Sequence, residues 1–158
     1  MNRAELLEAI LEARADWDAQ VSAVEMTRYE EPGVCGPWSL KDLIAHITWY
    51  EREIVQMLAA RSYTDASPWW ALPDDPRNEN IFTANRNRAL ADVLDDARAT
   101  YDALLAQIET VSDDDLNDAA RFEDSPPGAE PWEIIAQNTY EHYQHHAHDV
   151  EAWLESSA

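Results

Sequence analysis

The histidines are the residues of this 158-residue chain whose type and spacing could carry chemistry. His46 lies in one segment with helical periodicity, and the other four lie together near the C-terminus: His142, His145, His146 and His148. On a helix, residues four apart lie one above the other on the same face, about 5–6 Å apart at Cβ. His142 and His146 therefore have the spacing with which two imidazoles can share one metal ion.

His46 can complete such a site from a second helix. It falls at the border of the apolar stripe of its own segment, while His142 and His146 fall at the edge of the last segment's stripe and inside it. Three imidazoles with open positions for water are typical of catalytic zinc, which lowers the pKa of a bound water towards ~7. We predict that His46, His142 and His146 hold a divalent metal, zinc or nickel. The alternative is an amphipathic border whose imidazoles hydrogen-bond to carboxylates such as Glu141 or Asp149.

Glu51 is the second anomaly, because it falls inside an apolar stripe, where an unpaired carboxylate is costly. It is either a structural partner of one of the ten arginines or a general base whose pKa is raised by desolvation. Tyr50 and Tyr143 are core aromatics whose hydroxyls could orient a substrate. The predicted catalytic residues are therefore Glu51, with Glu53 as an alternative base, Tyr50 and Tyr143. Without a metal, His46 or Glu51 would activate water directly.

Charge and cysteine content restrict the partners. The chain has 32 acidic and 11 basic residues, a net charge of −21, so we expect no nucleic acid and no anionic membrane surface as a partner. Cations, including metal ions, are favoured. Cys35 is the only cysteine, which excludes an intramolecular disulfide and a Cys-rich zinc site. The first residues are charged where a signal peptide needs an apolar run, so we expect a cytoplasmic protein.

The elements that must position these residues are helices. Periodicity predicts helical segments over 3–26, from Leu40 to about Arg61, over 78–110 with a break near 88–89, and over 131–154. Ser39 and Asp42 form a predicted capping box, and Ser112 caps a single turn. Residues 62–77, with Trp69 and Trp70, are predicted as a long loop, and loops of this length are usually functional or mobile. The chain has 3 glycines and no convincing strand. The predicted fold is one all-α four-helix bundle domain over residues 1–158.

Three stretches of this sequence resemble DinB-like four-helix-bundle proteins and, more narrowly, the ClbS/DfsB family. They are WSLKDLIAHITWYE at 38–51, NRNRALADVL at 85–94 together with Asn80, and PWEIIAQNTYEHY at 131–143. The resemblance implies a bundle in which many members bind a divalent metal through three histidines, at the positions of His46, His142 and His146. Other members are thiol-dependent transferases or isomerases. The ClbS-type branch includes a self-resistance protein that hydrolyses the electrophilic cyclopropane of a genotoxic natural product without depending on that triad.

These observations predict a hydrolase, metal-dependent or water-activating, that acts on a small electrophilic molecule in a cavity between the second and fourth helices. The alternative is a non-catalytic protein that binds a small molecule or serves as a dimeric interaction module. The predicted cofactor is the divalent metal or none, the predicted partner is a small molecule, and homodimerisation is left open.

Overall fold

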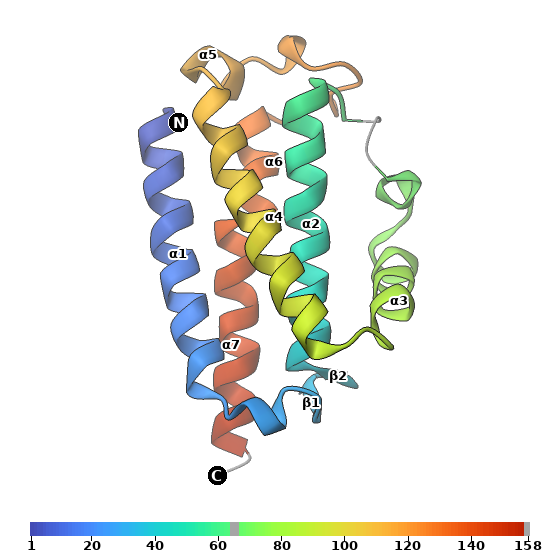
Figure 1. Ribbon diagram of the computed structural model, residues 1–158. Helices are drawn as coiled ribbons and strands as arrows, with labels where there is room; N and C mark the ends of the chain where they lie inside the picture. The colour runs from blue at the N-terminus through green and yellow to red at the C-terminus, as the bar shows by residue number, and fades with distance from the viewer. Residues whose placement is uncertain (64–66, 157–158) are drawn as a thin grey trace.

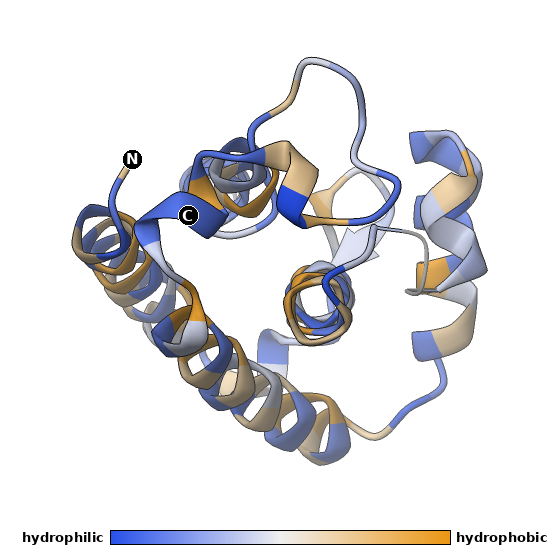
Figure 2. Ribbon diagram, turned by 90° about the horizontal axis from the view of Figure 1, so that it is seen from above, coloured by the Kyte–Doolittle hydropathy of each residue, from blue (hydrophilic) through white to orange (hydrophobic). Residues whose placement is uncertain are grey.

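The chain folds as an all-α helical bundle in the computed structural model, which describes residues 1–63 and 67–156. Its long helices are α1 (Arg3–Ala23), α2 (Leu40–Ala60), α4 (Leu90–Thr110) and α7 (Tyr140–Ser156) (Figure 1). α2 packs chiefly on α4, and α1 packs chiefly on α7. Viewed from above, the helices turn apolar residues towards one another (Figure 2). The predicted fold class is confirmed.

Side-chain caps set where the helices begin. Ser39 accepts a hydrogen bond from the backbone N–H of Asp42, whose carboxylate accepts from the N–H of Ser39, so the predicted capping box is present. Ser112 caps the single turn α5 (Asp113–Leu116) in the same way. Caps of this kind satisfy N–H groups that have no partner inside the helix. Because the start of α2 is fixed, the phase of His46 two turns later is fixed as well.

α2 is the central element and is covered on almost every side. α4, α3, α7 and the β1–β2 hairpin all contact it. Its apolar residues Leu43 and Ile54 are fully buried, and its polar residues His46, Glu51 and Glu53 are at most 4% exposed. A helix buried all round must bury its polar side chains too, so each of them needs a partner or a function.

The prediction of no strand is wrong. β1 (Pro32–Cys35) and β2 (Trp38–Ser39) form an antiparallel hairpin in which Cys35 pairs with Trp38. Gly36 occupies the turn with φ of 56°, a conformation that glycine adopts without strain. β1 also packs on α7. The first helix ends at Ala23 rather than at residue 26, and a 3₁₀ turn (Met26–Arg28) leads into the hairpin.

The predicted loop 62–77 is partly helical. A 3₁₀ turn covers Pro68–Ala71, and α3 (Asp74–Asn85) begins before residue 78, while residues 64–66 lie outside the described part. α3 lies outside the bundle, against α2 (Figures 1 and 2). Arg77 holds the segment in place, because its guanidinium donates to the carbonyls of Trp69, Trp70 and Leu72. The predicted break is confirmed, since α3 ends before residues 88–89 and α4 begins at Leu90.

The predicted last helix is divided into α6 (Pro131–Gln137) and α7. Asn138 Nδ2 donates to the carbonyl of Ile134 at 2.7 Å, and Thr139 Oγ1 donates to that of Ile135 at 2.6 Å. Side chains that bond to carbonyls four residues earlier compete with the backbone and often bend a helix. A 3₁₀ turn (Ala119–Arg121) lies between α5 and α6. None of the helices in the described ranges carries an apolar run sufficient to cross a bilayer.

Candidate metal centre

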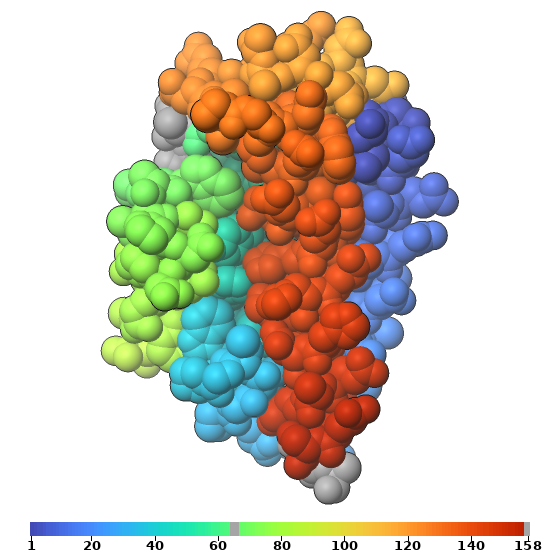
Figure 3. Space-filling model, turned by 180° about the vertical axis from the view of Figure 1, so that it is seen from behind, coloured from blue at the N-terminus to red at the C-terminus, as the bar shows by residue number. Residues whose placement is uncertain are grey.

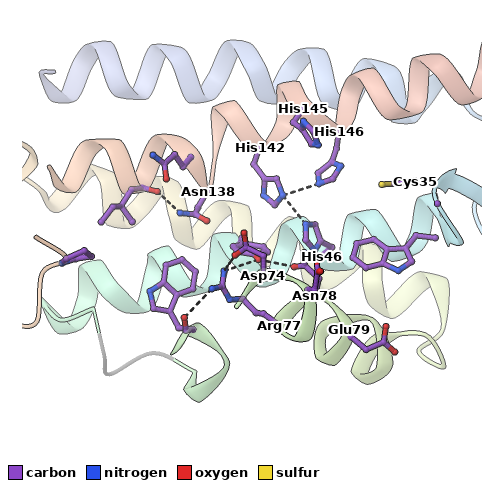
Figure 4. Close-up of a pocket in the computed structure, with 18 of the residues that line it drawn as sticks. Cys35, His46, Asp74, Arg77, Asn78, Glu79, Asn138, His142, His145 and His146 are labelled. Carbon is purple, nitrogen blue, oxygen red and sulfur yellow. Dashed lines mark hydrogen bonds and ion pairs between the residues drawn. The ribbon is translucent and has the colours of Figure 1, made fainter. Parts of the chain in front are cut away.

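Three imidazoles from two helices converge on one point. His142 Nε2 on α7 lies 3.0 Å from His46 Nε2 on α2 and 3.1 Å from His146 Nε2, one turn further along α7 (Figure 4). His46 and His146 are buried, and His142 is half-buried. The chain segments that carry these nitrogens are about a hundred residues apart, so the bundle fold itself assembles the cluster.

Burial keeps the three imidazoles neutral. Desolvation, aided by the neighbouring histidines, lowers the pKa of His46 to about 3. The same causes lower the pKa of His142 well below its ordinary value. Burial also lowers the pKa of His146, although Asp149 opposes that shift. A neutral imidazole is the form that binds a metal ion, so no proton has to leave before an ion enters near neutral pH.

The three histidines differ in whether the other ring nitrogen, Nδ1, has a hydrogen-bond partner. His146 Nδ1 contacts Asp149 Oδ2 at 2.8 Å. The Nδ1 atoms of His46 and His142 are buried and have no hydrogen-bond partner among the described residues. There is room for few protons between three Nε2 atoms that face one another. A single cation between them can accept a lone pair from each. Three neutral nitrogen ligands suit zinc or nickel, so the residues present fit a divalent metal.

Aromatic rings hold two of these imidazoles in place. His46 packs against Trp38 and Tyr50, with ring centroids 5.2 and 5.0 Å apart. His142 meets the Tyr50 ring edge-on at 5.0 Å. Edge-to-face pairs at such distances are favourable and restrict rotation of the rings. Tyr50 is therefore a supporting wall of the centre.

The imidazoles lie in a cavity of about 950 Å³. It opens where the surface is hollowed between α3 and the α6–α7 pair, with α2 visible between them (Figure 3). Aromatic and polar side chains line it together, among them Trp38, Tyr50, Trp70, Arg77, Asn78, Gln137 and Asn138. A concave site with apolar walls and a few directed polar groups is the usual form of a small-molecule site.

Two residues of α3, Arg77 and Asn78, fix the hydroxyl of Tyr50 in the wall of the cavity. Tyr50 Oη donates to Asn78 Oδ1 at 3.0 Å and accepts from Arg77 Nη1 at 3.3 Å. Burial raises the pKa of Tyr50, so its hydroxyl stays protonated at neutral pH. Sequence reasoning did not identify Arg77 or Asn78, because Arg77 fell in the predicted loop and Asn78 at the predicted start of the next helix. The signal was present in Asp74-Asp75-Pro76, since acidic residues and proline favour the first turn of a helix.

Glu51 and Tyr143, two of the predicted catalytic residues, belong to a different network. Glu51 Oε1 accepts from Arg14 Nη1 at 2.7 Å and from Tyr143 Oη at 2.6 Å. Burial raises the pKa of Glu51 to about 7 against the attraction of Arg14. Neither Glu51 nor Tyr143 is among the described residues that line the cavity. This geometry matches the structural interpretation of Glu51, a buried ion pair with an arginine. Glu53 accepts from the backbone N–H of Ser67 at 2.9 Å.

The fold and the three-histidine cluster define a DinB-like helical bundle with a candidate metal centre. The family model of the mycothiol maleylpyruvate isomerase N-terminal domain matches residues 10–151. The chain therefore belongs to this family, within the DinB-like superfamily, and the predicted resemblance is confirmed at that level. No protein of curated function matches the sequence.

Solved structures share the same bundle at low sequence identity. The sibling lethal factor precursor DfsB is 13% identical with a TM-score of 0.80, covering 99% of this chain and 97% of its own. The colibactin self-resistance protein ClbS, crystallised with dsDNA, is 14% identical with a TM-score of 0.75, covering 96% and 94%. A mutant of the mycothiol-dependent maleylpyruvate isomerase is 14% identical with a TM-score of 0.74, covering 95% of this chain and 61% of its own. At these identities the likeness shows the fold alone.

The comparison with ClbS corrects one prediction. We expected the net charge of −21 to exclude nucleic acid as a partner. That exclusion is wrong, because a protein with this fold has been crystallised in complex with dsDNA. Net charge is an average over the whole surface, and binding depends on the local field.

Proposed function

We propose that this protein is a metal-dependent hydrolase of a small electrophilic molecule, with His46, His142 and His146 as the ligands of a divalent zinc or nickel ion. The observation that carries the proposal is the convergence of three neutral imidazoles at the wall of a cavity of about 950 Å³, with the Nε2 atoms of His46 and His146 3.0 and 3.1 Å from His142 Nε2. Evolution of a core without such a role would favour aliphatic residues at these positions.

A divalent ion held there would lower the pKa of a water molecule towards ~7 and supply a nucleophile at neutral pH. The protein's own residues would bind and orient the substrate. Tyr50 presents its hydroxyl between Asn78 and Arg77, and its ring covers two of the imidazoles. Trp70 stands against Tyr50 with ring centroids 6.0 Å apart and closes the same wall. A substrate with a flat apolar part and one polar reacting group fits these surroundings.

Glu51 and Tyr143 receive a supporting role in this proposal rather than a catalytic one. Tyr143 neighbours His142 in sequence, and its hydroxyl is anchored on Glu51, which Arg14 holds in turn. This network joins α1, α2 and α7 at one level of the bundle. It would therefore keep the histidines of α7 in phase with His46 on α2.

A thiol-dependent reaction is the second candidate, and the family match favours it. The matching domain is named for an isomerase that uses mycothiol, and one structural neighbour is that mycothiol-dependent enzyme. The cavity would then hold a low-molecular-weight thiol beside the electrophile. A protein that binds a small molecule without turnover, alone or as a homodimer, is the non-catalytic alternative.

An aryl epoxide, phenyl glycidyl ether, can separate these candidates. The protein is freed of metal with a chelator, reloaded with zinc and incubated with the epoxide, and products are followed by mass spectrometry. The proposal expects water to open one C–O bond and give the diol with the zinc-loaded protein, and expects His46→Ala to reduce the rate to background. His148→Ala is the matched control, because the side chain of His148 is 81% exposed.

Each other outcome overturns the proposal of a hydrolase that depends on a metal at the three histidines. A product that forms only when a thiol is added, and that contains the thiol, supports the second candidate. Saturable binding by calorimetry without any product supports the non-catalytic alternative. Equal diol formation in the wild type and in His46→Ala places the chemistry away from the three histidines.

A further inference from the structure

The three candidate ligands differ in how their rings are held. Among the described residues, only His146 has a partner for its second ring nitrogen, the Asp149 carboxylate 2.8 Å from Nδ1. The ring of His146 also meets those of His46, His142 and His145, with centroids 5.1, 4.8 and 4.9 Å apart. The contact of Nδ1 with Asp149 therefore distinguishes how His146 is held from how His46 and His142 are held.

A carboxylate without a proton can only accept hydrogen bonds, so the proton in this contact belongs to His146 Nδ1. The neutral imidazole then has its lone pair on Nε2, the atom that faces His142 at 3.1 Å. We propose that Asp149 is a positioning residue of the metal centre, which holds His146 as the Nδ1–H tautomer and aims its Nε2 lone pair at the ion. The inference rests on the proposed function, because it assigns a role within that centre.

The surroundings of Asp149 support this role. Its side chain is 28% exposed, and the helix sets its spacing from His146 at three residues. Cys35, on the β1 strand that packs on α7, approaches so that ligand atoms of Cys35, His146 and Asp149 all lie within 4.8 Å of one another. The Asp149 carboxylate therefore lies where β1 meets α7, within hydrogen-bond distance of His146.

The chain offers a matched control on the same helix. His148 and Glu151 repeat the spacing of three residues, with His148 Nδ1 3.7 Å from Glu151 Oε2. Their side chains are 81% and 56% exposed, and neither lines the cavity among the described residues. Glu151→Ala removes the same kind of carboxylate from the same helix without touching the candidate centre.

The first test reads the tautomer in the metal-free protein by ¹⁵N NMR of the histidine rings. We expect His146 of the wild type to carry its proton on Nδ1, and Asp149→Ala to shift that proton to Nε2. Asp149→Asn keeps an acceptor oxygen and should retain the wild-type tautomer, as should Glu151→Ala. A wild-type His146 protonated on Nε2, or an Asp149→Ala tautomer identical to the wild type, overturns the inference without any metal being involved.

The second test measures zinc affinity by competition with a chromophoric chelator. Loss of a partner in the outer shell of a metal site typically costs about 10–100-fold in affinity. We expect that loss for Asp149→Ala, a smaller loss for Asp149→Asn, and affinity within about twofold of wild type for Glu151→Ala. Asp149→Ala within about threefold of a zinc-binding wild type refutes only the role of Asp149. A wild type that binds no zinc refutes the proposed function, while the tautomer test still decides whether Asp149 orients His146.

Discussion

Replacing Arg14 with methionine should destabilise the protein strongly, because it leaves Glu51 without its counterion in the core. The Glu51 side chain is 1% exposed and that of Arg14 is 11% exposed. Once Arg14 is gone, Tyr143 is the remaining donor to Glu51 Oε1, and Oε2 already has no partner among the described residues. Methionine keeps much of the apolar volume of the arginine, so the change tests the charge more than the packing.

The expected loss in the free energy of unfolding follows from the burial of the Arg14–Glu51 ion pair. Breaking a buried ion pair by removing one partner costs about 3–5 kcal/mol in the free energy of unfolding. In a domain of this length, each kcal/mol lowers the melting temperature by about 2–4 °C. The melting temperature of Arg14→Met should therefore fall by about 6–20 °C.

The loss of stability in Arg14→Met should grow as the pH rises. The folded-state pKa of Glu51, about 7, lies above its ordinary value of 4.5, so the fold favours the protonated carboxyl. The stability linked to this group is fully present below pH 4.5 and is lost as the pH rises through about 7. Without Arg14 the pKa rises further, so the loss continues above pH 7 at up to about 1.4 kcal/mol per pH unit.

Thermal and urea unfolding followed by circular dichroism at pH 6, 7 and 8 measure both effects. Glu51→Gln is the companion variant, because its amide oxygen still accepts from Tyr143 and it cannot ionise. The double variant Arg14→Met/Glu51→Gln should be less destabilised than the sum of the two single changes. Equal destabilisation of Arg14→Met at all three pH values, or strict additivity, would refute the ion-pair account. Normal stability with lost hydrolysis in Glu51→Gln would return Glu51 to the catalytic role.

Three further changes test other parts of the structure. Trp70→Ala removes an aromatic partner of Tyr50, so KM for phenyl glycidyl ether should rise about 3–10-fold in steady-state kinetics. Lys41→Met removes an ammonium that donates to Glu30 and to two backbone carbonyls, so urea unfolding should show a loss of about 2–3 kcal/mol. Burial raises the pKa of Asp115, but hydrogen bonds from Ser112 and Arg61 outweigh it and lower the pKa. Its stabilisation is therefore present above about pH 3.8 and lost below, so the gap in unfolding free energy between wild type and Asp115→Asn should narrow from pH 7 to pH 2.5.

The sequence allowed those features to be predicted that depend on local spacing. The Ser39–Asp42 capping box set the phase of α2, and helical periodicity set that of α7, so the convergence of His46 with His142 could be predicted without coordinates. Apolar stripes also indicated which helix faces meet, which is why the bundle could be predicted from the sequence.

Features that depend on tertiary contact were missed or left open. The hairpin strands are short and carry no alternating pattern, and β1 packs on α7, far away in the sequence. α3 has a polar sequence and is held by Arg77 through carbonyls of the preceding turn, an interaction that periodicity does not register. The partner of Glu51 also stayed open, because ten arginines were available and only the packing of α1 on the bundle selects Arg14.

The central claim is that His46, His142 and His146 bind one divalent metal ion. Zinc titration of the chelator-treated protein by calorimetry, alongside His46→Ala and the control His148→Ala, tests it most directly. The account predicts one zinc ion bound per chain by the wild type and by His148→Ala, and a loss of that binding in His46→Ala. Absence of zinc and nickel binding by the wild type, or binding that His46→Ala leaves unchanged, would contradict it.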